Sequence, residues 1–421
     1  MKVGFELHVT PLTESKMYCD CPTKNAQPNL QVCPICTGQP GSKPMAPNET
    51  ALRAGIKLAK ALNCTLNESV SVMRKHYFYP DLPNNYQLTS EPFGENGSFN
   101  NVGITEIHFE EDPGQYDPKS GLVDLNRSGS PLLEVVTEPD IDSIEKARDF
   151  LEEFSALLGF LGISQKIKAD TNVSINGGAR VEVKNIGSIS GALNAIQYEV
   201  NRQAKEGAVL ETRHYDKDTM TTKPARLKET VADYRYMREP NLPTIHLGKL
   251  IKETPEPPKL DEIRQKLVAQ GLTMETARII TSEKWLYDLF NNVNMDKAEL
   301  AKFLRRDLLN ELKYRQISFE NSSLDVQKLE QLLNEGISPR ARTEKLRALL
   351  DNKAVDVTEA SHDDLEKAVD AVLEIEAAAV EKYKNGKKNL FNYFLGEVDK
   401  KLGHSVKPGD IARVLKKKLG S

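Results

Sequence analysis

Four of the five cysteines in this sequence lie between positions 19 and 36 and form two short pairs. Cys19 and Cys21 enclose one residue, whereas Cys33 and Cys36 enclose two. Zinc binds four thiolates in a tetrahedron, and two tight corners of the chain can each supply two of them. The pattern therefore predicts a structural zinc ion in a knuckle at residues 19–36, worth on the order of 10 kcal/mol to folding. The alternative is that packing alone orders this loop.

A second set of polar residues alternates with apolar ones along segments typical of strands. Side chains two positions apart on a strand point to the same face of a sheet. These residues are Glu6 and His8 near the start, Lys168, Asp170 and Asn172 further along, and then Arg180, Glu182 and Lys184. Carboxylate and imidazole groups suit Mg²⁺, which keeps several waters and commonly holds phosphates.

The segment His108–Asp112 ends a predicted strand in three consecutive carboxylates. Like charges so close together are tolerated in solvent or around a cation. If the strands converge, Glu6, His8, Glu111 and Asp170 would form a Mg²⁺ site. The alternative is an ordinary solvated sheet face, which alternation alone also describes.

Aromatic and basic residues are concentrated in Arg74–Pro83, which contains two prolines, and Tyr86 follows shortly after. Prolines stiffen a loop, aromatic rings stack on a base or ribose, and cations contact phosphate. The candidate nucleotide or substrate contacts are Arg74, Lys75, His76, Tyr79 and Tyr86, with Asn126, Arg127 and Lys184 as further candidates. The alternative is an aromatic plug beside a basic turn. The chain has no G-x-x-x-x-G-K-[ST] loop, dinucleotide-binding glycine motif or G-x-S-x-G elbow, so any ATP phosphates would be held by side chains and metal.

The hydrophobic pattern of the 421-residue sequence changes near residue 250. Before it, short alternating segments are broken by Gly, Pro and Asn; after it, helical periodicity continues to the end. We therefore predict an α+β fold. A cradle domain with a mixed or antiparallel sheet (1–250) is followed by a Pro-rich linker (251–259), a helical bundle domain (260–370) and a small all-helical tail (371–421).

The charge is uneven along the chain, although the net charge is only −4. From residue 382 onward, basic residues outnumber the acidic Glu397, Asp399 and Asp410. The basic residues are Lys382, Lys384, Lys387, Lys388, Lys400, Lys401, Lys407, Arg413 and Lys416 to Lys418. A basic tail on an acidic body indicates contact with a polyanion, or else a solvated helical surface. No stretch is apolar enough to span a membrane and no signal-peptide core begins the chain, so we expect a cytoplasmic protein.

Several of these segments resemble one family along essentially the whole chain. In order, they are 4–8 (GFELH), 13–17 (TESKM), the cysteine pairs, 74–81 (RKHYFYPD), 94–97, 103–112, 124–127, 131–134, 137–140, 169–174, 181–185, 211–213 and 233–236. The chain thus resembles the B subunit of the heterotrimeric Asp/Glu-tRNA(Asn/Gln) amidotransferase, the GatB family. It departs at His76, where the family usually has Asn, and at Phe5, where it has Leu or Ile; it is also shorter than many members.

The resemblance implies a protein-biosynthesis ligase in which a partner amidase subunit releases ammonia and a third, smaller protein braces the pair. On this chain, ATP with Mg²⁺ would phosphorylate the side-chain carboxylate of a misacylated Glu-tRNA(Gln), Asp-tRNA(Asn) or both, and ammonia would then amidate it. His8 and Glu111 would be Mg²⁺ ligands, with Glu6 and Asp170 close by. Lys75 would lie beside the pocket, Tyr79 and Tyr86 would form its walls, and the tail would contact tRNA.

Two other functions are compatible with parts of this pattern. One is a zinc-stabilised tRNA-binding module without catalytic activity, which would have no use for carboxylates beside His8. The other is the related archaeal two-subunit amidotransferase chain, whose larger inserted domain has no counterpart in this sequence.

Overall fold

The computed structural model describes residues 1–24, 26–164, 167–225, 234–335, 337–353, 362–402, 406 and 408–419. Two of the residues named above, Asp233 of the 233–236 segment and Lys407 of the tail, lie outside this part of the chain. The chain forms two compact units: residues 1–266 with 281–284, and residues 267–280 with 285–421.

The first unit contains a twelve-stranded mixed sheet. Its main path has the order β14-β13-β12-β11-β1-β10-β7-β5-β4-β15, and only the β12–β13 pair is parallel among the described strands. The strands on this path are β1 (Lys2–Val9), β4 (Val72–His76), β5 (Tyr86–Ser90), β7 (Val102–Asp112), β10 (Ser130–Thr137), β11 (Ile167–Ser174), β12 (Val181–Lys184), β13 (Glu211–Asp216), β14 (Thr221–Pro224) and β15 (Met237–Arg238). Off this path, β2 (Thr65–Leu66) pairs with β6 (Gly94–Phe99), which also pairs with β7. Small two-stranded sheets join β3 (Ser69–Val70) to β16 (Ile245–His246) and β8 (Gln115–Tyr116) to β9 (Val123–Asp124).

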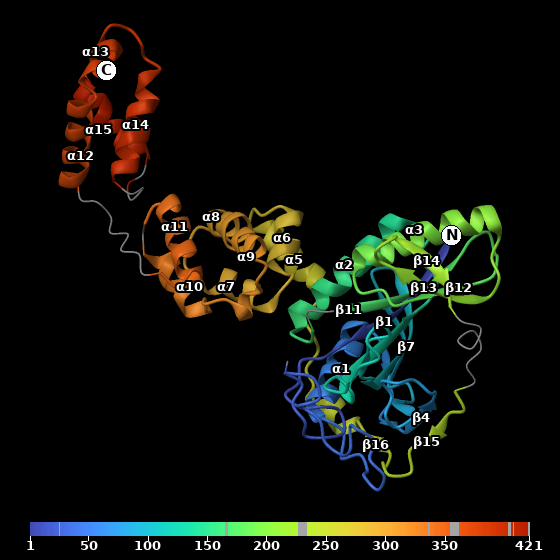
Figure 1. The fold of residues 1–421 in the computed structure, drawn as a ribbon. Helices are drawn as coiled ribbons and strands as arrows, with labels where there is room; N and C mark the ends of the chain where they lie inside the picture. Colours follow the sequence, from blue (N-terminus) through green and yellow to red (C-terminus); the bar gives the residue numbers. More distant parts are fainter. Residues whose placement is uncertain are drawn as a thin grey trace. The chain divides into compact units, whose positions relative to one another are not determined.

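Three helices pack on one face of the sheet: α1 (Glu49–Ala61), α2 (Ile144–Leu161) and α3 (Ile189–Glu206) (Figure 1). The rings of Phe5 on β1 and Phe150 on α2 stack with centroids 5.9 Å apart. Gly55 lets α1 approach closely, because a Cβ atom there would lie 2.4 Å from the ring of Phe109. The apolar side chains of the strands therefore pack against the helices on this face, and the alternating polar side chains point to the opposite face of the sheet.

Polar side chains cap the starts of α1 and α2. Asn48 caps α1, since its side chain accepts a hydrogen bond from the Ala51 N–H. Ser143 caps α2, since its side chain accepts a hydrogen bond from the Lys146 N–H. Helix α4 (Gly248–Glu253) extends into the segment predicted as the start of an extended linker.

After α4, the regular elements of the described residues are all helical. The elements are α5 (Leu260–Ala269), α6 (Met274–Ile280), α7 (Lys284–Asn292), α8 (Lys297–Lys302), the π turn η2 (Phe303–Leu308), α9 (Leu309–Arg315), the 3-10 turn η3 (Phe319–Asn321), α10 (Val326–Asn334), α11 (Pro339–Leu350), α12 (His362–Ile375), α13 (Ala377–Lys384), α14 (Leu390–Lys401) and α15 (Pro408–Leu419). The α+β fold class, with its mixed sheet and helical C-terminal region, is confirmed. No helix in the described ranges is both long and apolar enough to cross a membrane.

Helices α12, α14 and α15 lie side by side (Figure 1). They share one hydrophobic core, to which α12 contributes Leu365 and Val369, α14 Phe394 and α15 Leu415. A domain boundary between residues 370 and 371 would cut through this core. Helix α12 therefore belongs to the tail, and the tail begins no later than His362.

Candidate functional site

Polar side chains gather on the sheet face opposite α1, α2 and α3. On β1, Glu6 lies opposite Asp170 of β11, and His8 lies opposite Glu134 of β10. We call the residues at the middle of this face the central cluster: Glu6, His8, Lys75, Glu110, Glu134, Asp170, Glu182 and Lys184. The sheet register thus brings Glu6, His8, Asp170 and Lys184 together, as their alternation predicts.

The imidazole of His8 lies between two carboxylates. Its Nε2 atom is 3.5 Å from an oxygen of Glu6 and 3.5 Å from an oxygen of Glu134. Burial alone would lower the pKa of His8, but its contacts with Glu134 and Glu6 raise the pKa well above the usual value. Burial would likewise raise the pKa of Glu6, yet His8 and the charge of Lys184 hold it well below its usual value.

Two lysines complete the cluster. The Lys184 ammonium is 2.9 Å from Glu182 and 3.6 Å from Asp170. Lys75, on β4, lies 4.9 Å from the centre of the Tyr234 ring. Despite desolvation, nearby carboxylates raise the pKa of both lysines: mainly Glu110 and Glu134 for Lys75, and Glu6 and Asp170 for Lys184. Both amines therefore carry a positive charge at a face rich in carboxylates.

The predicted position of Glu111 in this cluster is wrong. Glu110 lies opposite Leu132, whereas Glu111 lies opposite Pro131, so the two carboxylates point to opposite faces of the sheet. Glu111 accepts a hydrogen bond from the Leu88 N–H and lines a small cavity together with Tyr18, Cys36 and other residues near the cysteine loop.

Glu110, which the sequence pattern did not single out, takes the place on the polar face. It is 2% exposed, and the amide of Gln87 donates a hydrogen bond to it at 3.2 Å. Burial and the neighbouring Glu134 raise the pKa of Glu110 to about 7. Glu134 was not predicted either. A signal was available, because Glu134 is the single charged residue of its strand and lies two positions from the apolar Leu132 and Val136.

The other residues predicted to contact the substrate do not all lie together, and each has its own neighbours outside the central cluster. Arg74 faces away from the central cluster: its guanidinium makes hydrogen bonds of 2.6 and 3.0 Å to the fully buried Glu239 and lies 4.4 Å from the centre of the Tyr86 ring. His76 contacts Tyr86 edge-on, and its Nδ1 lies 3.1 Å from the Arg235 carbonyl. Tyr79 is half exposed and packs against Tyr116.

Asn126 and Arg127 hold loops in place. Asn126 accepts from the Gln31 N–H and donates to the Gln27 carbonyl, which ties it to the cysteine loop. Arg127 donates to the carbonyls of Pro113 and Gly114, and its Nε is 3.4 Å from Asp112. Asp112 shares the face of Glu110, so Arg127 lies at the margin of the polar face.

The four cysteines of the knuckle fit a zinc ion. One sulfur from each of Cys19, Cys21, Cys33 and Cys36 lies within 4.8 Å of the others. Tetrahedral Zn–S bonds of about 2.3 Å place sulfurs roughly 3.8 Å apart, and Cys36 lies 3.9 Å from both Cys21 and Cys33. The Lys16 ammonium is 3.3 Å from the Cys36 sulfur, so it can balance part of a thiolate charge.

A second group of potential metal ligands lies in the central cluster. Atoms of Glu6, His8 and Glu134 lie within 4.8 Å of one another. The buried Oε2 atom of Glu134 makes no hydrogen bond of good geometry among the described residues and has the His8 Nε2 atom, 3.5 Å away, as its charged neighbour. A cation bound between these groups would be a further partner for this oxygen. Asp170 is adjacent but falls outside this group of three.

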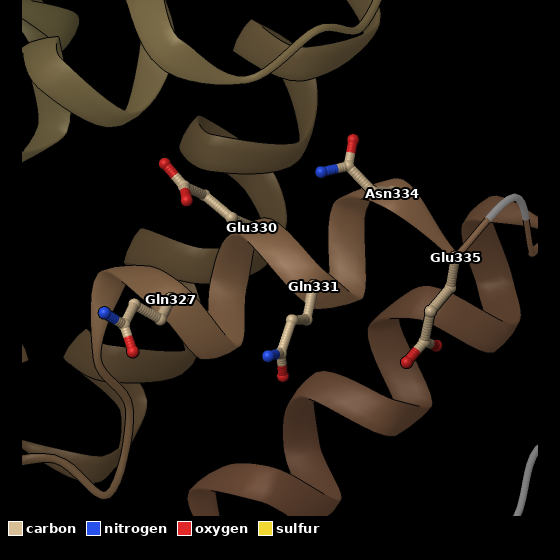
Figure 2. A pocket seen from close by; sticks show the side chains of 5 residues that line it. All are labelled: Gln327, Glu330, Gln331, Asn334 and Glu335. Atoms are coloured by element: carbon tan, nitrogen blue, oxygen red, sulfur yellow. The ribbon is translucent and has the colours of Figure 1, made fainter.

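Helix α10 carries a hollow of a different kind. Figure 2 shows its five lining side chains, on α10 and just after its end, which point in different directions without converging. They are Gln327, Glu330, Gln331, Asn334 and Glu335. Glu335 is already paired with Lys345 at 2.6 Å. This surface has none of the convergent charge of the central cluster.

Together these features define a class of protein: an α+β domain whose open sheet face carries a cluster of carboxylates, a histidine and two lysines, followed by helical segments. Residues 1–253 match the model of the GatB/GatE catalytic domain, and residues 288–419 match that of the GatB domain. The chain belongs to the GatB family, the B subunits of aspartyl/glutamyl-tRNA(Asn/Gln) amidotransferase, which are components of tRNA-dependent ligases.

Three relatives that carry the name of this amidotransferase component illustrate the similarity. Identity is 37% to the protein from Methanopyrus kandleri and 39% to that from Methanosphaera stadtmanae, in each case over all of this chain and 99% of the relative. It is 38% to the protein from Methanothermobacter thermautotrophicus, over the full length of both chains. The alignments span 450 to 457 positions, so these relatives contain segments that the 421-residue chain lacks.

Proposed function

We propose that the central cluster activates the side-chain carboxylate of Glu or Asp esterified to tRNA, using ATP, and then amidates it with ammonia. The proposal is carried chiefly by the meeting of Glu6, His8 and Glu134 with Lys75 and Lys184 on one sheet face. The name of the relatives specifies aspartyl/glutamyl-tRNA(Asn/Gln) as their substrate. A side-chain carboxylate does not react with ammonia unless one oxygen first becomes a leaving group.

The reaction has two steps, each of which exchanges one bond for another. A carboxylate oxygen of the substrate attacks the γ-phosphorus of ATP, the bond to ADP breaks, and an acyl phosphate forms. Ammonia then attacks the acyl carbon, the C–O bond to phosphate breaks, and the nitrogen loses a proton. The products are the amide, ADP and inorganic phosphate.

The residues of the cluster have distinct parts in this scheme. Glu6, His8 and Glu134 would hold Mg²⁺, which neutralises phosphate charge when bound. Lys75 and Lys184 carry fixed positive charge toward the transferring phosphoryl group. Glu110, whose pKa of about 7 leaves it partly ionised at neutral pH, accepts the proton released by the attacking nitrogen.

Zinc in the knuckle is structural in this proposal. The ammonia comes from a partner amidase subunit, and a third, smaller protein braces the cytoplasmic complex. The tail contributes RNA binding, although part of its charge is already balanced: Lys418 is 2.7 Å from Asp370, and Lys417 is 4.0 Å from Glu366.

The test is amidation of Glu-tRNA and Asp-tRNA by the assembled complex with ATP, using ammonium chloride so that the amidase step is bypassed. We expect Glu134→Gln and His8→Gln to lower kcat/KM by about 100-fold or more, the usual effect of removing one charge-stabilising group. Glu152→Gln, an exposed carboxylate on α2, is the control and should retain wild-type activity. Wild-type rates in both cluster variants would reject the proposed site. Tight tRNA binding without ATP-dependent product in the wild type would instead favour a pure tRNA-binding module.

A further inference from the structure

Lys16 is the only lysine among the buried residues that the structure describes, and 1% of it is exposed. Its ammonium donates hydrogen bonds to the Cys36 sulfur and to the Leu125 carbonyl, each at 3.3 Å. No carboxylate of the described residues forms an ion pair with it. Because a buried cation without a counter-charge is strongly unfavourable, the cysteine centre must supply the negative charge that this ammonium needs.

The backbone of Lys16 reaches the other pair of cysteines. Its N–H donates to the Cys21 carbonyl at 3.0 Å, and its own carbonyl accepts from the Asn48 amide at 3.4 Å. Lys16 thus contacts the first cysteine pair through its backbone and the second through its side chain. The hydrogen bond to Leu125 adds the loop between β9 and β10, so one residue joins both corners of the knuckle to the sheet-containing unit.

The contact with Lys16 makes the two buried cysteines unlike each other. Cys19 and Cys36 are 6% and 5% exposed, so access to solvent does not distinguish them. Of the two, Cys36 alone accepts a hydrogen bond from the Lys16 ammonium. A zinc ion held by four thiolates carries two excess negative charges, and the ammonium offsets one of them at the Cys36 sulfur. A charge-assisted hydrogen bond stabilises that thiolate and makes it the weaker nucleophile of the pair.

We propose that Lys16 is a positioning residue of the zinc site, which makes Cys36 the anchoring thiolate and tightens the hold of the whole knuckle on its metal. The inference rests on the structural zinc of the proposed function, and it assigns to this chain a residue outside the four ligands. Partners of metal ligands typically change metal affinity by about 10- to 100-fold. A lysine that merely filled space would have no such effect, because a neutral side chain of similar length would replace it.

The first test measures the zinc affinity of the full-length chain by competition with a chromophoric chelator. K16M keeps the length of the side chain and removes its charge, so it should weaken zinc binding by about 10- to 100-fold. K16R restores a cation and should recover part of this loss. The matched control is K57M, because Lys57 of α1 is half-buried and donates to the Leu161 carbonyl at 2.5 Å, far from the cysteines in sequence. It should bind zinc like the wild type. Wild-type affinity in K16M, or an equal loss in K57M, would overturn the inference.

The second test uses the wild-type chain and does not depend on the folding of any variant. The zinc-loaded protein is treated briefly with N-ethylmaleimide, so that most chains are modified at one cysteine at most, and the modified peptides are identified by mass spectrometry. At each modified cysteine a sulfur–carbon bond forms as the zinc–sulfur bond breaks. Cys19 should react several-fold faster than Cys36, and the difference should disappear in K16M. Equal rates for Cys19 and Cys36 in the wild type would overturn the inference. A wild-type chain that binds no zinc would instead overturn the structural zinc of the proposed function.

Discussion

Glu110 is the residue for which the structure makes the sharpest prediction. Its carboxyl is 2% exposed, with Glu134 and Lys75 as charged neighbours. Because burial raises its pKa from 4.5 to about 7, the folded protein binds a proton at Glu110 over a pH range in which the unfolded chain does not. Stability from this group is therefore complete below about pH 4.5 and is lost as the pH rises through about 7.

The size of this effect follows from the pKa difference. At 1.36 kcal/mol for each pKa unit, ionising Glu110 in place costs about 3 kcal/mol above pH 7. Glu110→Gln is neutral at every pH and keeps the shape of the side chain, so it should escape this cost. We expect the variant to gain up to about 3 kcal/mol over the wild type between pH 5 and pH 8.

The assay is urea unfolding of the full-length chain at both pH values in magnesium-free buffer, with pulse proteolysis to follow the sheet-containing unit. Glu111→Gln is the comparison, because burial also raises the pKa of Glu111 to about 7 but its side chain is on the other face. Both variants should gain stability at pH 8, whereas only Glu110→Gln should slow amidation. An equal stability difference at pH 5 and pH 8 for Glu110→Gln would refute the reasoning, and loss of amidation in Glu111→Gln alone would restore the sequence-based assignment.

Three further predictions follow from other contacts. Arg74→Met should destabilise the sheet-containing unit by about 3 to 5 kcal/mol, because it strands the buried Glu239 carboxylate; denaturation that matches the wild type would make Arg74 a substrate residue instead. Cys33→Ser should reduce bound zinc, measured by elemental analysis, while full zinc retention would contradict the four-thiolate site. Truncation before His362 should weaken tRNA binding and flatten its salt dependence, and it should leave the rest of the chain folded, whereas a cut after Glu374 removes partners of α12 and should cause aggregation.

Strand periodicity was sufficient to predict most of the central cluster. The alternation in β1 and β11 placed Glu6, His8 and Asp170 on one face, and the register puts Glu6 directly opposite Asp170. The fold class could also be predicted, because the hydrophobic pattern of the sequence changes from the alternation of strands to the periodicity of helices. These successes share one cause: each depends on the geometry of a single segment or of two regular strands.

The errors arose where register between distant strands decides the outcome. In 108–112, three adjacent carboxylates must alternate between faces, and only the pairing of β7 with β10 shows that Glu110 shares the face of Glu134. Arg74 and Lys75 are adjacent in the same way, so one reaches Glu239 and the other the central cluster. A one-residue change of register reverses every such assignment, and local sequence contains no signal for it.

The central cluster contains more carboxylates than positively charged groups. With all groups ionised, five carboxylates (Glu6, Glu110, Glu134, Asp170 and Glu182) face three cations (His8, Lys75 and Lys184), which leaves two negative charges in excess. The raised pKa of Glu110 shows how the isolated chain relieves part of this excess, by retaining a proton. A divalent cation that displaces the His8 proton and binds this imidazole would relieve part of the excess, and would also permit a polyphosphate to approach a face that otherwise repels it. Burial, together with the neighbouring Glu134, makes Glu110 hard to ionise, and the excess of carboxylates on this face would favour the binding of a metal ion and, with it, of an anionic substrate.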